Sequence, residues 1–334
     1  MSAIRFAITG CGKISLRHAA EAARQGQLVA VCDIVPEKAD QLAAEFGVTA
    51  YYHLTDLLKS AHRPDVLAVC TPNGIHAEDS VLAMESGCHV LCEKPMCITV
   101  NEAERMIRVS RETGRKLFVV KSARYNPGLI GLKKLLEEDQ LGKLYSFQLN
   151  CFWNRPPAYY AGSWRGTEQD GGTLFTQFSH YIDALLWLLG DIREIRGFRR
   201  NQAHTGIILS EDCGVCALDM ENGMLGGLNW SVNVYRENME ISLTILAENG
   251  TIRLGGPYMN RVEYQLGESL VTLSPGSGLP NDYGNYKGSM SHHDQVYANL
   301  VRALADETHP FTGPEDGLRT VQLIESIYKT ISLS

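Results

Sequence analysis

The segment Thr9-Gly10-Cys11-Gly12-Lys13-Ile14-Ser15 joins the apolar run Arg5–Thr9 to the amphipathic stretch Ser15–Gln25. A short apolar run is typical of a buried strand, and apolar residues spaced at helical intervals are typical of a helix. Gly10 permits a tight turn, and Gly12 lets an anion approach the backbone at the helix N-terminus. The segment therefore predicts a strand–loop–helix unit with an anion-binding loop.

The same alternation of apolar runs and amphipathic stretches continues through the first part of the chain. The further runs are Leu28–Cys32, Val66–Cys70, His89–Cys92 and Leu117–Val120, and the further stretches are Pro36–Phe46, His76–Ser86 and Thr99–Thr113. Repeated strand–helix–strand units pair their strands in parallel through right-handed crossovers. We therefore expect residues 1–125 to form a doubly wound α/β domain.

Asp33 identifies the anion that the glycine loop is expected to bind. It ends the second predicted strand, at the distance beyond Gly12 where an acidic residue binds the adenosine ribose of a dinucleotide. Ile34 and Val35 follow without a nearby arginine for a 2′-phosphate, which favours NAD over NADP. Ser15 stands where Gly or Ala is usual, and a plain glycine-rich turn would explain the loop alone, so Asp33 decides for a Rossmann domain. The expected cofactor contacts of this region are Gly10, Gly12, Lys13, Ile14 and Asp33.

Two more motifs follow predicted strands directly. Thr71-Pro72-Asn73 comes after Val66–Cys70, and Glu93-Lys94-Pro95 comes after His89–Cys92. In open α/β sheets, ligands bind at the edge formed by the carboxyl ends of the strands. A turn without function would explain the first motif equally well, whereas Lys94 places an ammonium group where chemistry is expected.

The pattern changes after Pro127, where longer runs of strand character begin. These runs are Tyr145–Trp153, Val215–Met220, Leu225–Val234 and Met239–Ala247. Asn222-Gly223 and Asn249-Gly250 have the composition of hairpin turns, which indicates an antiparallel sheet. We expect one inserted helix and two closing helices, over Leu174–Leu189, about Ser291–Asp306 and Gly317–Ile331, and long loops over Gly255–Gly288. Residues 126–334 would form one α+β domain, with the last helix able to pack back on the first domain.

Composition excludes several classes of protein. The chain has 334 residues, 44% of them hydrophobic and 21% charged, as in globular proteins of about two domains. Its net charge of −7 argues against nucleic acid as a main partner. No apolar run approaches the roughly 20 residues of a membrane helix, so we expect no membrane partner. Nine cysteines, an odd number, without a signal-like segment fit reduced thiols and a cytoplasmic location.

The motifs together resemble the glucose–fructose oxidoreductase/inositol dehydrogenase (Gfo/Idh/MocA) family. They are the Gly10–Ser15 loop, Thr71-Pro72-Asn73 with His76, Glu93-Lys94-Pro95, and the later His180-x-x-Asp183. In this family, a Rossmann domain precedes a domain with an open-faced, mostly antiparallel sheet. The resemblance implies an NAD-dependent dehydrogenase acting on CH–OH donors. It adds the cofactor contacts Thr71, Asn73, His76, Glu93, Lys94, Trp164 and Arg165.

Five segments of the second half resemble the UDP-N-acetylglucosaminuronate 3-dehydrogenases of bacterial polysaccharide biosynthesis. They are residues 124–127, 152–155, 164–167, 171–177 and 281–286. Inositol dehydrogenases typically carry an aspartate four residues before the histidine, where this chain has Thr176. The resemblance implies oxidation at C3 of a UDP-linked N-acetylated uronic acid. An apolar open sheet face further predicts a homo-oligomer, a tetramer.

Lys94 and His180 are the two titratable candidates for catalysis. Oxidation of an alcohol requires a group that takes the hydroxyl proton. The ordinary pKa of histidine, ~6.5, suits this role, whereas a lysine needs desolvation or a neighbouring cation. We assign His180 as the general base and Lys94 as its hydrogen-bonding partner, and the reverse assignment stays open. Asp183, on the same helical face, either orients His180 or is structural.

An anionic substrate on a protein of this charge needs local cations, and the planar fork of arginine suits carboxylate and diphosphate. Any single arginine of the five segments would also be explained as a surface residue. The predicted substrate contacts are Lys94, Arg124, Tyr125, Asn126, Arg155, Arg165, Thr176, Gln177, His180, Tyr286 and His293. No metal is expected, because the adjacent His292 and His293 would point roughly 100° apart on a helix.

Two other interpretations remain. One is a dehydrogenase or reductase of another nucleotide sugar, a free sugar or a polyol, which assays on such compounds would distinguish. The other is a catalytically silent sensor that binds a dinucleotide and a partner protein. The presence of both Lys94 and His180 argues against a sensor, because a sensor has no chemical need for the pair.

Overall fold

The structure is a computed structural model that describes residues 3–267, 270–276, 280–282, 287–290 and 292–333. The chain divides into two compact units. The first unit comprises residues 1–121 and 293–322, and the second comprises residues 122–292 and 323–334. The sequence pattern predicted one domain over 126–334, with the last helix able to pack back on the first domain.

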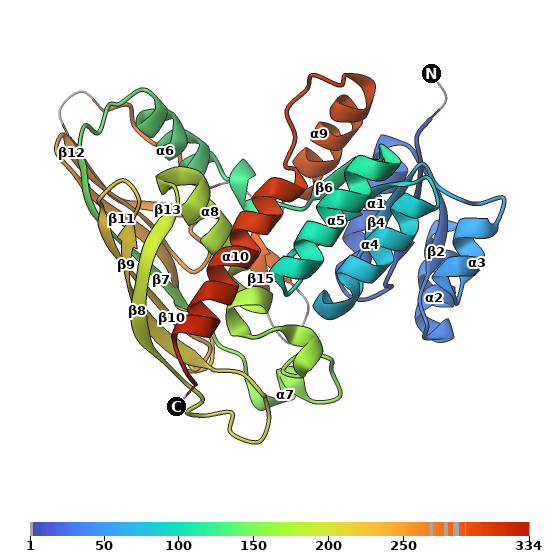
Figure 1. The fold of residues 1–334 in the computed structure, drawn as a ribbon, viewed down its shortest axis with the longest axis horizontal. Helices are drawn as coiled ribbons and strands as arrows, with labels where there is room; N and C mark the ends of the chain where they lie inside the picture. The colour runs from blue at the N-terminus through green and yellow to red at the C-terminus, as the bar shows by residue number, and fades with distance from the viewer. Residues whose placement is uncertain (1–2, 268–269, 277–279, 283–286, 291, 334) are drawn as a thin grey trace. The chain divides into compact units, whose positions relative to one another are not determined.

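The first unit is built on a six-stranded sheet with the order β3-β2-β1-β4-β5-β6 (Figure 1). Its strands are β1 (Arg5–Thr9), β2 (Gln27–Cys32), β3 (Thr49–Tyr51), β4 (Val66–Val69), β5 (His89–Cys92) and β6 (Leu117–Val119). All neighbouring strands pair in parallel, as predicted. The strand order reverses between β1 and β4, and such a reversal opens a crevice for a ligand.

Helices and short turns connect these strands. They are α1 (Ser15–Gln25), α2 (Pro36–Phe46), α3 (Leu54–Lys59), the 3₁₀ turn η1 (Asn73–Ile75), α4 (His76–Glu85) and α5 (Val100–Thr113). From the C-terminal part of the chain, the unit adds α9 (His293–Ala305) and the first part of α10 (Pro314–Thr330). Local sequence explains the bounds of α5: Thr99 and Glu102 form a capping box, and Gly114 ends the helix with a φ of 64°. Helix α9 packs against α1 although the two are far apart in sequence.

The second unit contains a seven-stranded sheet with the order β13-β12-β11-β7-β10-β9-β8. Its strands are β7 (Leu144–Phe152), β8 (Ile192–Arg200), β9 (Cys213–Met220), β10 (Leu225–Ser231), β11 (Glu240–Ala247), β12 (Gly250–Gly255) and β13 (Arg261–Gly267). Strands β7 and β10 pair in parallel, and the other neighbours pair antiparallel. The sheet is therefore mixed and mostly antiparallel, which confirms the predicted fold class.

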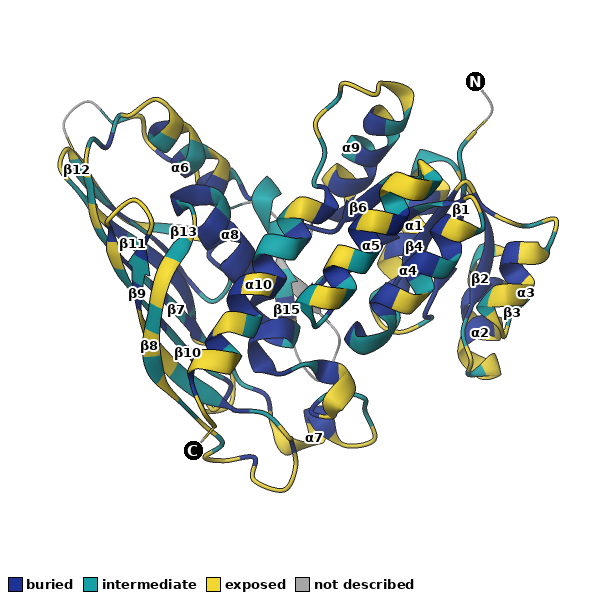
Figure 2. Ribbon diagram, viewed as in Figure 1, coloured by how far each residue is buried: buried dark blue, intermediate teal, exposed yellow. Residues whose placement is uncertain are grey.

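Helices cover one face of this sheet. The remaining elements of the unit are η2 (Ser122–Tyr125), α6 (Pro127–Glu137), α7 (Pro157–Tyr160), η3 (Glu168–Asp170), the π-helical turn η4 (Leu174–Phe178), α8 (Ser179–Leu189), β14 (Pro280–Asp282) and β15 (Lys287–Met290). Helix α8 is almost wholly buried (Figure 2). Trp153, at the end of β7, packs against Phe178 and Tyr181 at the start of α8. The helix is therefore held directly against the sheet.

The sheet also has exposed and partly exposed positions (Figure 2), and several of the exposed residues are apolar. They include Val215, Leu225 and Leu246, which line a shallow apolar depression together with Ser146 and Gln148. An apolar open face was predicted from the sequence. Exposed apolar patches of this kind often mark interaction surfaces.

The two edge strands, β8 and β13, were not predicted from the sequence. Neither strand has a fully buried position. Strand β8 is rich in charged residues and lacks a regular apolar alternation. Strand β13 does alternate apolar and polar residues, but it lies in the Gly-, Pro-, Asn- and Ser-rich region that was expected to be loops. Strands β12 to β15 also fall partly within the region 255–288 that was expected to be loops. The expected hairpins at Asn222-Gly223 and Asn249-Gly250 are present, between β9 and β10 and between β11 and β12.

All nine cysteines are free thiols. Cys216 is buried and Cys213 is partly exposed on β9. Among the helices of the described residues, none combines the length and the apolar character that crossing a membrane requires.

Candidate functional site

The glycine loop after β1 has the geometry of a phosphate-binding turn. Gly10 has a φ of 87°, and a Cβ there would lie 2.6 Å from backbone atoms of Cys70 and Thr71. Only glycine fits this position. No atom lies within 4 Å of the place that a Cβ on Gly12 would take, so this side of the loop is open. A phosphate can therefore approach the backbone there, ahead of α1.

Asp33 fixes the loop to the end of β2. Its Oδ2 accepts a hydrogen bond from the backbone N–H of Cys11 at 2.7 Å, and its Oδ1 accepts one from Val35 at 2.8 Å. Each carboxylate oxygen can accept a second hydrogen bond. Asp33 can therefore hold a ribose hydroxyl while it keeps the loop in place.

His76 links the two motifs at the ends of β4 and β5. Its Nδ1 lies 2.7 Å from the carbonyl oxygen of Pro95, and its Nε2 lies 2.7 Å from that of Thr71. The side chain is buried, and both ring nitrogens face carbonyl oxygens, so a neutral ring donates to one of them and an imidazolium donates to both. His76 was expected to contact the cofactor; its ring instead holds the Thr71-Pro72-Asn73 turn against the Glu93-Lys94-Pro95 segment.

Glu93 and His293 also point into the interior of the first unit. The Oε1 of Glu93 lies 2.9 Å from Nε2 of His18 and 3.0 Å from Nε2 of His293, and all three residues are buried. Glu93 was expected to contact the cofactor and His293 the substrate, but these side chains are bonded to each other. Among the described residues, His18, Glu93 and His293 are the set whose ligand atoms are close enough for a metal ion.

Two lysines follow strands of the parallel sheet. Lys94 is partly exposed, whereas the residues on both sides of it, 91–93 and 95–97, are buried. Lys121 follows β6 and is buried, and its Nζ donates to Oγ1 of Thr320 at 3.0 Å. Lys121 was not selected from the sequence, although the argument used for Lys94, a cation directly after a buried run, applies to it equally.

In the second unit, His180 lies on α8 and is buried. Asp183, three residues later, forms a bidentate ion pair with Arg124: Nε and Nη2 each donate to one carboxylate oxygen at 2.8 Å. Arg124 was expected to bind an anionic substrate. Its planar fork is instead used by Asp183, and the ion pair neutralises a buried carboxylate one turn from His180.

Arg155 is a second arginine that is used internally. It is 2% exposed, and its guanidinium donates to Oε1 of Gln177, to the carbonyl oxygens of Asn154 and Lys287, and to Oδ1 of Asn238. Gln177 in turn donates to the hydroxyl of Tyr159 at 2.9 Å. The expected substrate contacts Arg155 and Gln177 therefore hold the second unit together, because protein acceptors take up their donors.

Asn126 is also structural. It is buried and caps α6: its Oδ1 accepts from the backbone N–H of Gly128, and its Nδ2 donates to the carbonyl oxygen of Met259. The candidate contacts of the second unit that stay partly exposed are Arg124, Tyr125, Trp164, Arg165 and Thr176. Tyr286 lies outside the described residues.

Arg165 is partly exposed, as Arg124 is, and its guanidinium is supported by aromatic rings. Its guanidinium lies over the rings of Tyr159, at 5.1 Å, and Trp164, at 4.9 Å, and it donates to the hydroxyl of Ser163. Aromatic faces attract a cation and hold it without using all of its N–H groups. Arg165 can therefore present donors to an anion.

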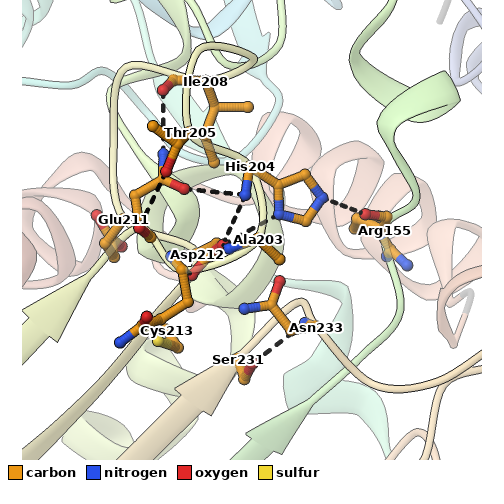
Figure 3. Close-up of polar contacts among 12 residues, drawn as sticks. Arg155, Ala203, His204, Thr205, Ile208, Glu211, Asp212, Cys213, Ser231 and Asn233 are labelled. Atoms are coloured by element: carbon orange, nitrogen blue, oxygen red, sulfur yellow. Dashed lines mark hydrogen bonds and ion pairs between the residues drawn. The ribbon is translucent and has the colours of Figure 1, made fainter.

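A buried ion pair that was not predicted from the sequence anchors the loop after β8 (Figure 3). The Nδ1 of His204 lies 3.1 Å from Oδ2 of Asp212, and its Nε2 lies 2.8 Å from the carbonyl oxygen of Arg155. Asp212 also accepts from the backbone N–H groups of Gln202 and Ala203. No residue spacing in the sequence signals this pair, because the loop between its members has no regular periodicity.

Two families of known proteins match the chain. Residues 4–121 match the oxidoreductase family with an NAD-binding Rossmann fold, and residues 130–253 match the GFO/IDH/MocA C-terminal domain. The first match covers the strands of the parallel sheet, and the second covers most strands of the mixed sheet. The first half therefore binds NAD.

Solved structures match along nearly the whole chain. The WlbA dehydrogenase of Bordetella pertussis, in complex with NADH and UDP-GlcNAcA, is 33% identical, with a TM-score of 0.86 over 98% of this chain and 96% of that one. The WlbA dehydrogenase of Chromobacterium violaceum, in complex with the same two molecules, is 30% identical, with a TM-score of 0.87 over 99% and 94%.

A curated relative matches over a shorter stretch. The D-glucoside 3-dehydrogenase of Escherichia coli is 32% identical over 193 residues, which cover 57% of this chain and 55% of the relative's length. The chain thus spans about half of that enzyme.

The His204–Asp212 pair predicts a pH-dependent stability. The hydrogen bond to Asp212 raises the pKa of His204 above its ordinary value of 6.5. The contribution of His204 to the stability of the fold is therefore fully present below pH 6.5 and is lost as the pH rises through the folded-state pKa. Although burial opposes it, hydrogen bonds from His204 and from backbone hold the pKa of Asp212 well below 3.8. We expect the pair to stabilise the fold most between pH about 4 and about 6.5.

The variant His204→Gln tests this pair, because glutamine keeps the Nε2 donor and removes the charge. We expect the unfolding free energy of wild type, measured in urea titrations, to exceed that of the variant by about 2 kcal/mol near pH 6. Near pH 9 the difference should be smaller. A difference that stays constant over this range would show that His204 is not held as an imidazolium.

Proposed function

The chain belongs to the Gfo/Idh/MocA family of NAD-dependent oxidoreductases, and from this we propose that it oxidises the C3 hydroxyl of a UDP-linked N-acetylated uronic acid. The observation that carries the proposal is its likeness, over nearly the full length, to two dehydrogenases bound to NADH and UDP-GlcNAcA. The product would be a 3-keto sugar nucleotide of bacterial polysaccharide biosynthesis.

Each candidate residue has a role in this proposal. The open side of the Gly10 loop receives the diphosphate of NAD, and Asp33 binds the adenosine ribose. NAD supplies the hydride acceptor when it is bound. His180 takes the proton of the C3 hydroxyl and Lys94 hydrogen-bonds the same oxygen, with the reverse assignment open. A histidine in this role returns the proton to solvent between turnovers.

Arg165 is our proposed contact for the anionic groups of the substrate. Arg124 and Arg155 are bonded within the second unit, whereas Arg165 is partly exposed and held over two aromatic rings. Trp164, Thr176 and Tyr125 are further candidates of the same unit. A guanidinium suits both the carboxylate and the diphosphate of a UDP-uronic acid.

An enzyme for a non-nucleotide sugar is the second candidate function. The D-glucoside 3-dehydrogenase of Escherichia coli supports it, since its name specifies oxidation at the same ring position. In either case we propose that the protein works in the cytoplasm. We also propose that it self-associates, as a tetramer, through the apolar face around Val215 and Leu225; light scattering would give the number of subunits.

A substrate panel tests the proposed function. Purified protein with NAD is offered UDP-GlcNAcA, UDP-GlcNAc, UDP-glucuronate, methyl glucoside and inositol, and NADH is followed by absorbance. We expect kcat/KM to be at least about tenfold higher for UDP-GlcNAcA than for the sugars that lack either the carboxylate or the acetamido group. Higher activity on the glucoside would support the second candidate and overturn the first.

The variants Lys94→Ala and His180→Ala test the catalytic assignment. We expect each to lower kcat at least about a hundredfold, because each removes a group that contacts the reacting hydroxyl. The Kd for NAD should stay close to that of wild type in fluorescence titrations. Lys59→Ala and His53→Ala, at exposed positions, serve as controls. Wild-type turnover by either catalytic variant would refute its role.

A further inference from the structure

We infer that His18, Glu93 and His293 form a positioning unit that fixes the backbone carrying Lys94. The inference rests on the proposed catalytic role of Lys94. None of the three residues would touch the substrate; they would act through the main chain on which the lysine is mounted. We call these three residues the Glu93 anchor.

The Glu93 anchor joins three separate elements of the first unit. His18 lies on α1, Glu93 directly follows β5, and His293 begins α9. Both imidazoles approach the same carboxylate oxygen, at 2.9 and 3.0 Å, and their rings meet edge to face with centroids 5.0 Å apart. The carboxylate is therefore held from two directions by side chains that are themselves buried.

The other oxygen of Glu93 acts directly on Lys94. Oε2 accepts a hydrogen bond from the backbone N–H of Lys94 at 2.9 Å. Because Oε1 is held by the two histidines, this second bond fixes the peptide group between Glu93 and Lys94. On the far side of the lysine, the carbonyl oxygen of Pro95 is bonded to His76 at 2.7 Å. The main chain is thus held on both sides of Lys94.

A further hydrogen bond orients His18. Its Nδ1 lies 2.9 Å from the hydroxyl of Tyr297, which is buried on α9 one turn after His293. If Nε2 donates to Glu93, Nδ1 accepts from the tyrosine hydroxyl, and both nitrogens of the ring are satisfied. Although burial opposes it, the bonds from His18 and His293 hold the pKa of Glu93 well below its usual value. The anchor is therefore a hydrogen-bonded network around an ionised carboxylate.

Two features distinguish a positioning unit from a plain packing contact and from a zinc site. Burying the carboxylate of Glu93 costs free energy, and an apolar residue of similar size would pack the three elements together as well. The charge of Glu93 therefore needs a reason beyond packing. A tetrahedral zinc site with bonds of about 2.0–2.2 Å sets its ligand atoms roughly 3.3 Å or more apart. The distances of 2.9 and 3.0 Å from Oε1 of Glu93 to the two Nε2 atoms are shorter than that and are typical of hydrogen bonds.

The test compares His293→Leu with His293→Gln. Glutamine can present its amide nitrogen near the position of the histidine Nε2, whereas leucine presents no donor. His293 suits the test because it lies on α9 and not on the helix that follows the glycine loop. His53→Leu, at an exposed histidine of the same unit, is the matched control.

We expect His293→Leu to lower kcat at least about tenfold, because small displacements of a catalytic group are costly. The Kd for NAD should change less than about twofold, and His293→Gln should recover most of kcat. A readout without substrate is the labelling of Lys94 by trinitrobenzenesulfonate, followed by peptide mass spectrometry with the exposed Lys59 as internal reference. The labelling rate of Lys94 should change in His293→Leu and return in His293→Gln.

Three results would overturn the inference. They are unchanged kcat and unchanged Lys94 labelling in His293→Leu, a loss of kcat that is matched by an equal loss of NAD affinity, and stoichiometric zinc in wild type that is absent from His293→Leu. The proposed function fails separately, if wild type does not oxidise the UDP-sugar. In that case the labelling experiment still decides whether the anchor positions Lys94.

Discussion

Parallel pairing of the six strands in the first unit is the constraint on which the candidate site depends. It brings the carboxyl ends of all six strands to one edge of the sheet. The glycine loop, Asp33, Thr71 and Lys94 follow four of these strands, so residues far apart in sequence share one edge. An antiparallel arrangement would send alternate motifs to opposite edges. This topology brings together the motifs from which the first unit's function is inferred.

Buried carboxylates in both units form ion pairs, and these pairs engage side chains that a ligand would otherwise bind. Two histidines hold Glu93, Arg124 holds Asp183, and His204 holds Asp212. Each pair lowers the cost of burying a carboxylate. Arg124, which the sequence offered as a substrate contact, is bound in this way to Asp183, whereas the guanidinium of Arg165 lies over two aromatic rings.

The sequence predicted five of the six strands of the first unit, all but β3, because their signals are local. Buried runs identify the strands, and Gly10 and Asp33 lie at characteristic distances along the chain. The partners of side chains were not predictable in this way: Arg124 and Asp183 are 59 residues apart, and Glu93 and His293 are 200 apart. Residues such as His76, Asn126, Arg155 and His293 were selected by type, but tertiary pairing gives them structural partners. Strand β8 was missed because charged residues interrupt its apolar pattern, and β13 was missed because the Gly-, Pro-, Asn- and Ser-rich region around it predicted loops.

The central claim is that this chain moves a hydride from C3 of a UDP-linked uronic acid to NAD. Its most direct test uses UDP-GlcNAcA that carries deuterium at C3, incubated with the protein and NAD. The account predicts that the deuterium appears in the NADH that is formed, as seen by mass spectrometry of the recovered nucleotide, and that a 3-keto sugar accumulates in equal amount. NADH without deuterium, or no NADH, would contradict it.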